Sequence, residues 1–368
     1  MTREELSGVL ARGEEAPRAL GEEELAALLS LGAGSPEEAA LFAAARRVKD
    51  RRIGRRVSIR GLVEIGNVCA KDCLYCGIRR SNANVERYTL GADEIARSAA
   101  RAKSFGYASV VLQSGEIESE AHTAFVEEVL RRIAPLDLGV TLSLGEQSEE
   151  TYERWRRAGA ARYLLRIETS NERLYAAIHP ATHSWRRRRD CLAALARLGY
   201  QVGTGVMTGL PGQTARDLAR DIRFYADIDA DMIGMGPWIP HPDAPLDFPD
   251  PAERPSPRES LALALRMIAA TRLYLHDVNI AAATALQALA HDGREQGVAA
   301  GANVIMPNVT DVKYRKAYQL YSNKPCLDED AAACRTCLER RLAAIGERIL
   351  FGQRGDSPHY AAKSSRNK

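Results

Sequence analysis

The sequence contains no run of 18 consecutive apolar residues, so no segment is predicted to cross a membrane as a helix. Its first 30 residues are charged throughout and lack the apolar stretch of a secretory signal. We therefore expect a cytoplasmic protein without a membrane partner, in a compartment where thiols stay reduced. In such a compartment the seven cysteines indicate metal binding or catalysis more than disulfide bonds.

The chain also has little excess charge of either sign. Its 51 Lys and Arg residues nearly balance 48 Asp and Glu residues, which leaves a net charge of +3. This balance argues against a nucleic-acid partner held by a basic field. Hydrophobic residues make up 45% and charged residues 27% of the 368 residues. These fractions are typical of a globular protein and exclude collagen-like, disordered and low-complexity classes.

Short β-rich runs alternate with amphipathic helical stretches from about residue 57 onward. Eight such runs in about 250 residues give about 31 residues per unit, which matches an α/β protein of the (β/α)8 barrel type. A doubly wound open sheet is the competing fold, because periodicity alone does not show closure. The predicted strands are 57–65, 108–113, 138–144, 162–168, 201–207, 231–236, 279–284 and 302–307.

The regions outside the barrel differ from it in pattern. Residues 22–31 and 36–48 carry apolar residues at helical spacing, with Ser35 as a plausible N-cap. The last residues are polar, which is typical of a disordered tail. The predicted segments are 1–50 (helical extension), 51–310 (barrel), 311–355 (C-terminal segment that bears cysteines) and 356–368 (disordered tail).

Three cysteines follow the first predicted strand, in GNVCAKDCLYCGIRRSN. Cys69, Cys73 and Cys76 offer three thiolates within eight residues, enough to hold a cubic iron–sulfur cluster and leave one iron open. An open iron can chelate a small molecule through its amine and carboxylate, and Tyr75 would shield the cluster from water. Structural zinc or free thiols are the alternatives. Zinc normally needs a fourth protein ligand, and no other His or Cys lies close by in sequence.

The pattern CxxxCxxC behind the first strand of an α/β barrel resembles that of the radical S-adenosylmethionine (SAM) enzymes. The resemblance implies a [4Fe–4S] cluster on these three cysteines, with SAM on the fourth iron. It also implies that one electron from the cluster cleaves SAM to methionine and a 5′-deoxyadenosyl radical. The residues predicted to bind SAM are Ser114, Gly115, Glu116, Ser143, Glu168, Arg188 and Met207.

The reasons for these assignments differ. The Ser-Gly-Glu run resembles the family's Gly-Gly-Glu segment, whose backbone binds the SAM amine. Glu168 ends a strand, where it can bind a ribose or the SAM ammonium, or support the next helix N-terminus. Arg188 suits the SAM carboxylate by bidentate pairing, with the register within 186–189 open by one residue. Met207 is either apolar cover for the adenine or barrel core, and Ser143 is the weaker strand-end candidate.

A second triplet, Cys326, Cys334 and Cys337, follows the last predicted strand. It offers three thiolates for an auxiliary iron–sulfur cluster ([2Fe–2S] or [4Fe–4S]), or for zinc. Cys191 is a formal fourth ligand, but its position in a helical pattern favours a buried structural residue.

A more specific resemblance covers nearly the whole chain. VVLQSGE, RYLLRIET, GLPGQT, IGMGPWIPHPDAPL, GANVIMPN and YRKAYQLY, with the second triplet, resemble the HydE family of [FeFe]-hydrogenase maturases. This implies assembly of the hydrogenase di-iron subcluster by adenosyl-radical attack on a cysteine-bound Fe(CO)2(CN) unit, an organometallic small molecule. The implied partners are the maturases HydG and HydF and a reductant such as ferredoxin or flavodoxin. The implied substrate-side residues are Arg162, Thr284, Met306, Tyr318 and Tyr321.

Two other functions compete with this interpretation. A radical SAM mutase similar to methylornithine synthase shares the first cysteine triplet and the barrel, but the second triplet argues against it. A non-enzymatic iron–sulfur carrier belongs to a different class, and it would bind iron without turning over SAM.

Overall fold

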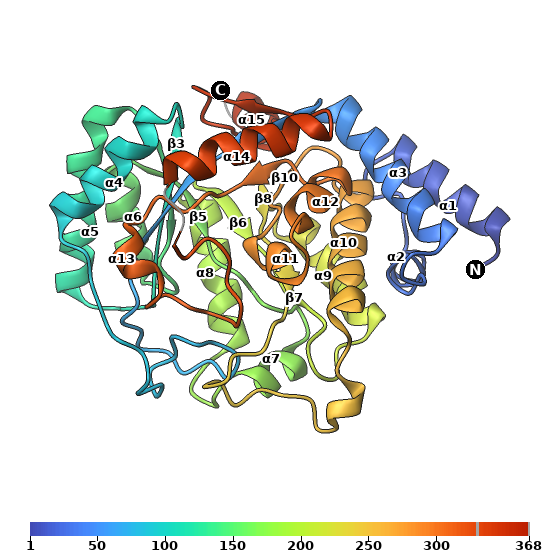
Figure 1. Cartoon of the computed structure of the whole chain (residues 1–368), viewed down its shortest axis with the longest axis horizontal. Coiled ribbons are helices and arrows are strands. Elements are labelled where there is room, and N and C mark those ends of the chain that lie inside the picture. Colours follow the sequence, from blue (N-terminus) through green and yellow to red (C-terminus); the bar gives the residue numbers. More distant parts are fainter. Residues whose placement is uncertain (329–330, 367–368) are drawn as a thin grey trace.

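The computed structural model describes residues 1–328 and 331–366. Its centre is a curled sheet of seven parallel strands in the order β10-β8-β6-β5-β4-β3-β2 (Figure 1). These strands are β2 (Gly61–Gly66), β3 (Ser109–Ser114), β4 (Gly139–Ser143), β5 (Ala160–Leu164), β6 (Gln201–Thr204), β8 (Met232–Ile233) and β10 (Asn279–Ile280).

An eighth parallel strand connects the two edges of this sheet. β11 (Val304–Ile305) pairs in parallel with β1 (Arg56–Ile59), which runs directly into β2. Two isolated parallel bridges complete the ring around the core, and they join Ala281 to Val304 and Leu62 to Asn308. All eight predicted strand regions therefore surround one core, and the prediction of a (β/α)8 barrel is confirmed.

Helices cover the outside of the barrel, and side-chain caps mark where they begin. Ser119, Ser148 and Ser184 accept backbone hydrogen bonds at the starts of α5, α6 and α8, which satisfies otherwise unpaired N–H groups. The barrel helices are α4 (Ala92–Ser104), α5 (Glu120–Ile133), α6 (Glu149–Arg157), α7 (Glu172–Ile178), α8 (Trp185–Arg197), α9 (Ala215–Asp227) and α10 (Pro257–Tyr274). The other elements are β7 (Met207–Thr208), β9 (Gly236–Pro237), α11 (Thr284–Leu289), α12 (Gly293–Ala299), α13 (Val312–Arg315), α14 (Ala331–Ala344) and β12 (Arg348–Leu350).

The amino-terminal residues form α1 (Arg3–Glu15), α2 (Glu22–Leu29) and α3 (Pro36–Arg52), as the helical spacing predicts. In Figure 1 they lie at one end of the molecule beside α10. The buried Arg266 of α10 donates to the Leu29 carbonyl (3.0 Å) and to Glu38 of α3 (2.7 Å). This one guanidinium therefore ties two extension helices to the barrel.

The prediction of a disordered tail is wrong for residues 356–366. Pro358–Arg366 form the helix α15, and the preceding Asp356 pairs with the buried Arg162 of β5. His359 lies 2.8 Å from Asp229, and Lys363 lies 2.8 Å from the buried Asp231. The tail is ordered because its charges meet opposite charges on the barrel, which composition alone does not show.

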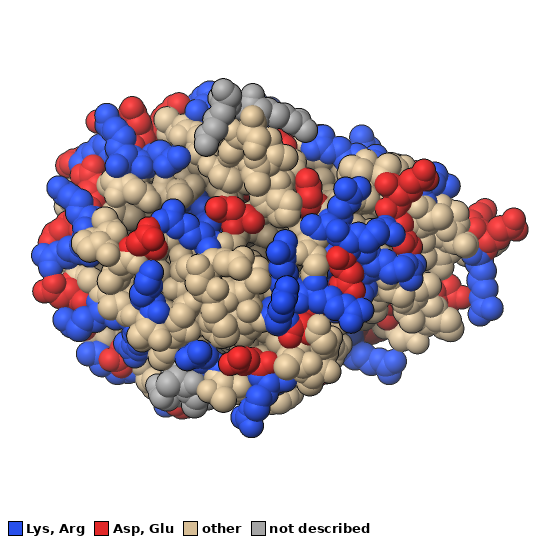
Figure 2. Space-filling view, turned by 90° about the horizontal axis from the view of Figure 1, so that it is seen from above, with Lys and Arg blue, Asp and Glu red and all other residues tan. Residues whose placement is uncertain are grey.

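Among the described residues, no helix combines the length and apolar character needed to cross a bilayer. Figure 2 shows one face of the molecule, on which basic and acidic side chains are interspersed.

Candidate active site

A cavity of about 320 Å³ opens at the carboxyl ends of the barrel strands, where barrels of this type hold their functional residues. Its volume lies within the range of small-molecule sites. The walls come from the strand ends, from the loop after β2 and from residues 318–324, which follow α13. The lining includes all three cysteines of the first triplet: Cys69, Cys73 and Cys76.

Backbone contacts hold the cysteine loop against two other segments. The amide of Glu116 donates to the Cys69 sulfur (3.3 Å), and the amide of Ala70 donates to the Glu116 carbonyl (2.8 Å). The amide of Gly77 donates to the Leu320 carbonyl (3.0 Å). The loop is thus fixed between the end of β3 and the segment that covers the cavity.

The three thiols suit a metal cluster better than free cysteines. Burial raises the pKa of the Cys69 and Cys73 thiols and raises that of Cys76 to about 12. Without a bound cation they are therefore inert as nucleophiles, whereas bound iron favours the thiolate. The donor set is three soft ligands that face a cavity, with no fourth cysteine among the described lining residues. It fits a [4Fe–4S] cluster with one iron open to a small molecule.

Gly115 allows the end of β3 to approach the cysteine loop. A Cβ at this position would lie 2.2 Å from the Val68 carbonyl oxygen and 2.7 Å from the Cys69 Cβ. No side chain fits there, so the backbone around Gly115 reaches the cavity. This geometry fits the expected contact of Ser114 and Glu116 with a ligand through the backbone.

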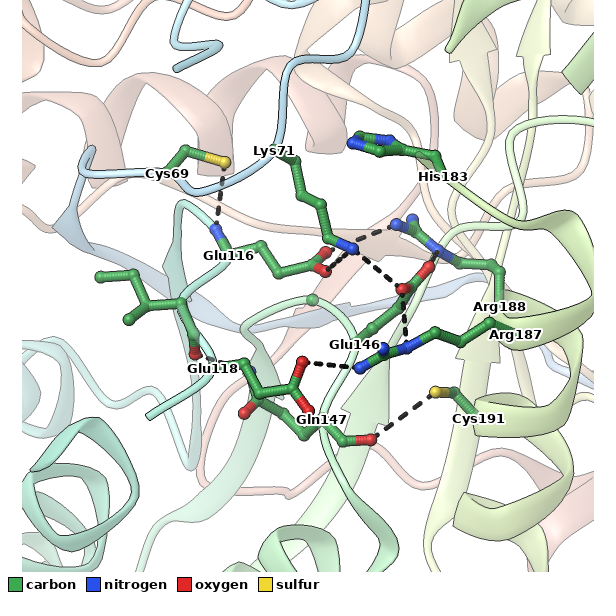
Figure 3. Close-up of polar contacts among 12 residues, drawn as sticks. Cys69, Lys71, Glu116, Glu118, Glu146, Gln147, His183, Arg187, Arg188 and Cys191 are labelled. Carbon is green, nitrogen blue, oxygen red and sulfur yellow. Dashed lines mark hydrogen bonds and ion pairs between the residues drawn. The ribbon is translucent and has the colours of Figure 1, made fainter. Parts of the chain in front are cut away.

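A compact network of charges borders the cavity (Figure 3). Arg188 donates to Glu146 (2.7 Å) and lies 3.4 Å from Glu116. Lys71, from the cysteine loop, lies 3.1 Å from each of the same two carboxylates. Burial opposes ionisation of Glu146, but the neighbouring Arg188 and Lys71 lower its pKa below the ordinary value. Arg187 also lies 3.3 Å from Glu146 and pairs with Glu118 at the surface, so three cations and three carboxylates meet in this network.

Arg188 is distinguished from its neighbours by burial. Its side chain is 8% exposed, whereas those of Arg186 and Arg189 are 77% and 50% exposed. Arg187 pairs with the surface residue Glu118 (2.6 Å). Within 186–189, Arg188 is the residue that lines the cavity. Cys191, one turn further along α8, is 7% exposed, as expected of a structural cysteine.

Glu168 and Arg166 face the cavity with unused hydrogen-bonding capacity. Glu168 has a positive φ of 67°, and its Oε2 lies 3.0 Å from Arg166 Nη2. Both atoms, and Arg166 Nε, are buried without a hydrogen bond of adequate geometry. Burial raises the pKa of the Glu168 carboxyl, and Arg166 acts against that rise. Because buried polar groups are normally satisfied, these atoms indicate a polar ligand.

The structure brings most of the predicted SAM and substrate residues to this cavity. The lining includes Ser114, Gly115, Glu116, Ser143, Glu168, Arg188, Met207, Thr284, Met306, Tyr318 and Tyr321. The Tyr318 hydroxyl accepts a hydrogen bond from Gln113 (3.2 Å).

Arg162 is not among the lining residues, and this placement corrects the sequence-based one. It lies near the amino-terminal end of β5, where its guanidinium bonds to the Arg354 carbonyl (2.9 Å) and to Asp356. Arg166, four residues further toward the carboxyl end, lines the cavity instead. The motif RYLLRIET contains both arginines. Their roles differ because Arg166 lies closer to the carboxyl-terminal end of the barrel, where the cavity is.

The second cysteine triplet is only partly described. Cys326 is half-buried, and its sulfur lies 3.9 Å from the Arg294 guanidinium. Cys337 is exposed on α14, and the side chain of Cys334 lies outside the described part of the chain. An auxiliary cluster at these cysteines stays a prediction.

Sequence reasoning also missed a histidine pair near Cys73. Within the described residues, the ligand atoms of Cys73, His179 and His183 lie within 4.8 Å of one another. Burial lowers the pKa of His179 to about 3 and that of His183 to about 4, so both rings are neutral at pH 7. No sequence spacing indicates this group, because 110 residues separate Cys73 from His183.

The barrel, the cysteine triplet and the cavity define a radical SAM enzyme, and residues 63–225 match the family model of the radical SAM superfamily. The chain is 43% identical over 309 residues to the [FeFe] hydrogenase maturase subunit HydE of Thermotoga maritima, across 84% of this chain and 86% of that protein. The chain therefore belongs to the HydE family of hydrogenase maturases, whose radical SAM chemistry implies a [4Fe–4S] cluster and SAM.

More distant relatives share the architecture. The chain is 27% identical over 288 residues to 3-methylornithine synthase of Methanosarcina acetivorans, across 78% of this chain and 79% of that protein. The crystal structure of methylornithine synthase matches 97% of this chain and 99% of its own, with a TM-score of 0.77 and 23% identity. HydG from Carboxydothermus hydrogenoformans matches 95% of this chain and 80% of its own, with a TM-score of 0.77 and 20% identity. At these identities the two structures show the shared fold.

Proposed function

We propose that this chain cleaves SAM reductively and acts on a cysteine-bound Fe(CO)2(CN) unit during assembly of the hydrogenase di-iron subcluster. The observation that carries the proposal is that one cavity is lined both by Cys69, Cys73 and Cys76 and by Arg166, Tyr318 and Tyr321. The 43% identity to a HydE protein supports the choice of substrate class.

The residues near the cysteine loop are suited to bind and orient SAM. Cys69, Cys73 and Cys76 hold the cluster, which when bound supplies the electron for cleavage of SAM to methionine and a 5′-deoxyadenosyl radical. Arg188 offers a buried guanidinium to the SAM carboxylate, with Glu116 and Glu146 fixing its position. The remaining SAM contacts fall to the backbone around Gly115, to Ser143 and Glu168 as hydrogen-bonding side chains, and to Met207 as apolar cover.

Other lining residues of the cavity are suited to a small anionic complex. Arg166 presents a buried Nε–H without a hydrogen-bond partner, beside an Nη2 that is ion-paired with Glu168, and this guanidinium matches a carboxylate or a cyanide nitrogen. Thr284 and Tyr321 add hydroxyl groups, and Met306 adds an apolar contact. Water is excluded by the segment that carries Tyr318 and Tyr321 across the cavity.

A buried ion pair holds this covering segment in place. Lys324 pairs with Glu64 of β2 and donates to the Tyr318 carbonyl (2.6 Å). The side chains of Lys324 and Glu64 are 9% and 1% exposed. Because breaking a buried pair is costly, the pair positions Tyr318 and Tyr321 against the cavity.

The remaining parts of the proposal concern partners and organisation. HydG would deliver the iron complex, HydF would receive the product, and a ferredoxin or flavodoxin would reduce the cluster. Residues 1–50 serve as a helical extension, 51–310 as the catalytic barrel and 311–355 as the segment with the auxiliary cysteines. The auxiliary cluster on Cys326, Cys334 and Cys337 is proposed to be dispensable for SAM cleavage.

The test is release of 5′-deoxyadenosine from protein reconstituted anaerobically with iron and sulfide, reduced and given SAM. We expect release by the unmodified chain and by Cys191→Ala, a matched cysteine control outside the cluster, and none by Cys76→Ala. Addition of a cysteine-bound Fe(CO)2(CN) complex is expected to accelerate release. Conversion of lysine to methylornithine would instead favour the mutase, and iron uptake without any SAM cleavage would favour the carrier.

A further inference from the structure

We propose that the cluster-free protein binds one divalent transition-metal ion of the zinc class on Cys73, His179 and His183, and that this ion competes with the iron–sulfur cluster for Cys73. The three residues come from different parts of the fold. Cys73 lies in the loop after β2, His179 directly follows α7, and His183 lies in the loop that leads into α8.

The distances suit a single ion. The three ligand atoms lie within 4.8 Å of one another, and His183 Nδ1 is 3.9 Å from the Cys73 sulfur. Tetrahedral zinc, with bonds of about 2.0–2.3 Å, needs ligand atoms about 3.5 Å apart. The observed separations of 3.9 Å and of at most 4.8 Å exceed this value only slightly, so small side-chain movements would complete the site.

The contacts of His179 already resemble those of a metal ligand. Its Nδ1 lies 2.9 Å from the Tyr175 carbonyl, which fixes Nδ1–H as the donor and Nε2 as the acceptor. The Nε2 atom lies 3.4 Å from the Tyr75 hydroxyl, a long contact that a bound metal ion would replace. Metal-bound histidines typically donate their other ring N–H to a carbonyl in this way. The ring also stacks on Tyr175, with centroids 3.9 Å apart, so its orientation is fixed before any ion binds.

The chemistry of the donors and the surrounding charge select the class of ion. One thiolate and two imidazoles suit zinc and cobalt better than magnesium or calcium, which prefer oxygen ligands. Figure 3 shows His183 beside the network of Lys71, Arg188, Glu116 and Glu146. The cations Lys71, Arg187 and Arg188 are each paired with a carboxylate of Glu116, Glu118 or Glu146, and this pairing limits their repulsion of a dication. Water can supply the fourth ligand.

Competition follows from the shared cysteine. Cys73 cannot serve the divalent ion and the cluster together, so cluster assembly requires that the ion leave. This second step rests on the proposed cluster role of Cys73, whereas the binding step does not. His183 distinguishes the two metal sites, because it belongs to the divalent site and not to the cysteine triplet.

The binding test uses cluster-free chain in which Cys326, Cys334 and Cys337 are replaced by serine, so that the second triplet contributes no metal signal. Anaerobic titration with Co²⁺ is expected to give one equivalent, with thiolate-to-cobalt absorption and the d–d bands of a tetrahedral ion. Cys73→Ser is expected to abolish the signal, and His183→Ala to weaken binding at least tenfold, while Cys69→Ser retains it. Equal binding by His183→Ala, loss in Cys69→Ser, or no cobalt uptake would overturn the site.

The competition test follows cluster formation by its visible absorption after addition of iron and sulfide. One equivalent of Zn²⁺, added first, is expected to slow cluster formation at least several-fold in the starting protein. The His183→Ala protein keeps all three cysteines, so its cluster is expected to form equally fast with and without zinc. Zinc-insensitive assembly in the starting protein would overturn the competition. Release of 5′-deoxyadenosine without zinc reports on the proposed function separately.

Discussion

The pH dependence of stability provides a quantitative test of the burial of Asp221, whose carboxyl group lies near the turn that carries Glu168. The residue lies on α9 with no exposed surface, and its Oδ1 accepts a hydrogen bond from the Ser170 amide (2.5 Å). Its Oδ2 has no hydrogen-bond partner. Ser170 follows Glu168 closely, so Asp221 supports the turn that aims Glu168 into the cavity. Burial raises the pKa of Asp221 from 3.8 to about 7, against the opposing effect of the Ser170 hydrogen bonds.

The effect on stability follows from linkage between folding and proton binding. Because the folded pKa is the higher one, the folded chain retains a proton that the unfolded chain has lost between pH 4 and pH 7. Asp221 therefore stabilises the folded state most at low pH, and this contribution falls as pH rises toward 7. A shift from 3.8 to about 7 corresponds to about 4 kcal/mol, at 1.36 kcal/mol per pH unit.

The perturbation is Asp221→Asn, which keeps an oxygen acceptor for Ser170 but cannot ionise. We expect the free energy of unfolding of the variant, relative to the unmodified chain, to rise by about 1.4 kcal/mol per pH unit between pH 5 and pH 6.5. The difference should level off above pH 7.5. Urea unfolding of cluster-free protein at several pH values measures it, with the exposed Asp190→Asn as a control. A difference that stays constant with pH would refute the placement of this carboxyl group.

Three further perturbations test other contacts. Gly115→Ala forces a methyl group into the cysteine loop, so we expect loss of reconstituted iron, whereas Gly8→Ala in α1 should stabilise the chain by about 0.5–1 kcal/mol. Asp356→Asn removes the counter-charge of a buried arginine and should lower the free energy of unfolding by about 1 kcal/mol, whereas Asp137→Asn, at an exposed pair, should change it by less than about 0.5 kcal/mol. Lys324→Met leaves a buried carboxylate without its cation and should cost about 3 kcal/mol, with Lys324→Arg retaining most of the stability. Iron content after reconstitution measures the effect of Gly115→Ala, and urea unfolding measures the expected changes in the other variants.

The barrel and the cysteine site could be predicted because both depend on local patterns. Alternation of β-rich and helical stretches indicates parallel strands, and the carboxyl ends of such strands meet at one mouth. Cys69, Cys73 and Cys76 follow the first strand, and Glu168 follows the strand near residue 164, so the sequence already directs both to the same cavity. The closing bridges through β11 rest on only a few residues, which explains why periodicity left an open sheet as an alternative.

Arg162 and the histidine pair show where sequence patterns stop being informative. Arg162 lies in β5, and Arg166 lies in the segment that follows it. The two residues are only four positions apart, yet Arg162 bonds to the carboxyl-terminal tail and Arg166 lines the cavity. His179 and His183 meet Cys73 only because the α7–α8 connection lies against the cysteine loop. The contact between these residues depends on tertiary packing, so it could not be predicted from composition or from the spacing of residues in the sequence.

Different segments of the chain lie across the two ends of the barrel, and this difference determines the route into the cavity. At the amino-terminal end, the Arg354 carbonyl accepts hydrogen bonds from Ser109 and Arg162, and the Gly355 carbonyl accepts them from Arg60 and Asn279. These four side chains hold the tail backbone across the strand ends. The carboxyl-terminal tail of the chain therefore covers the amino-terminal end of the barrel. At the carboxyl-terminal end, residues 318–324 are held by the Lys324–Glu64 ion pair, by the hydrogen bond from Gln113 to the Tyr318 hydroxyl, and by backbone hydrogen bonds at Leu320 and Ser322. Because the cavity lies at the carboxyl-terminal end and the tail lies across the other end, SAM and substrate are expected to enter from the carboxyl-terminal side.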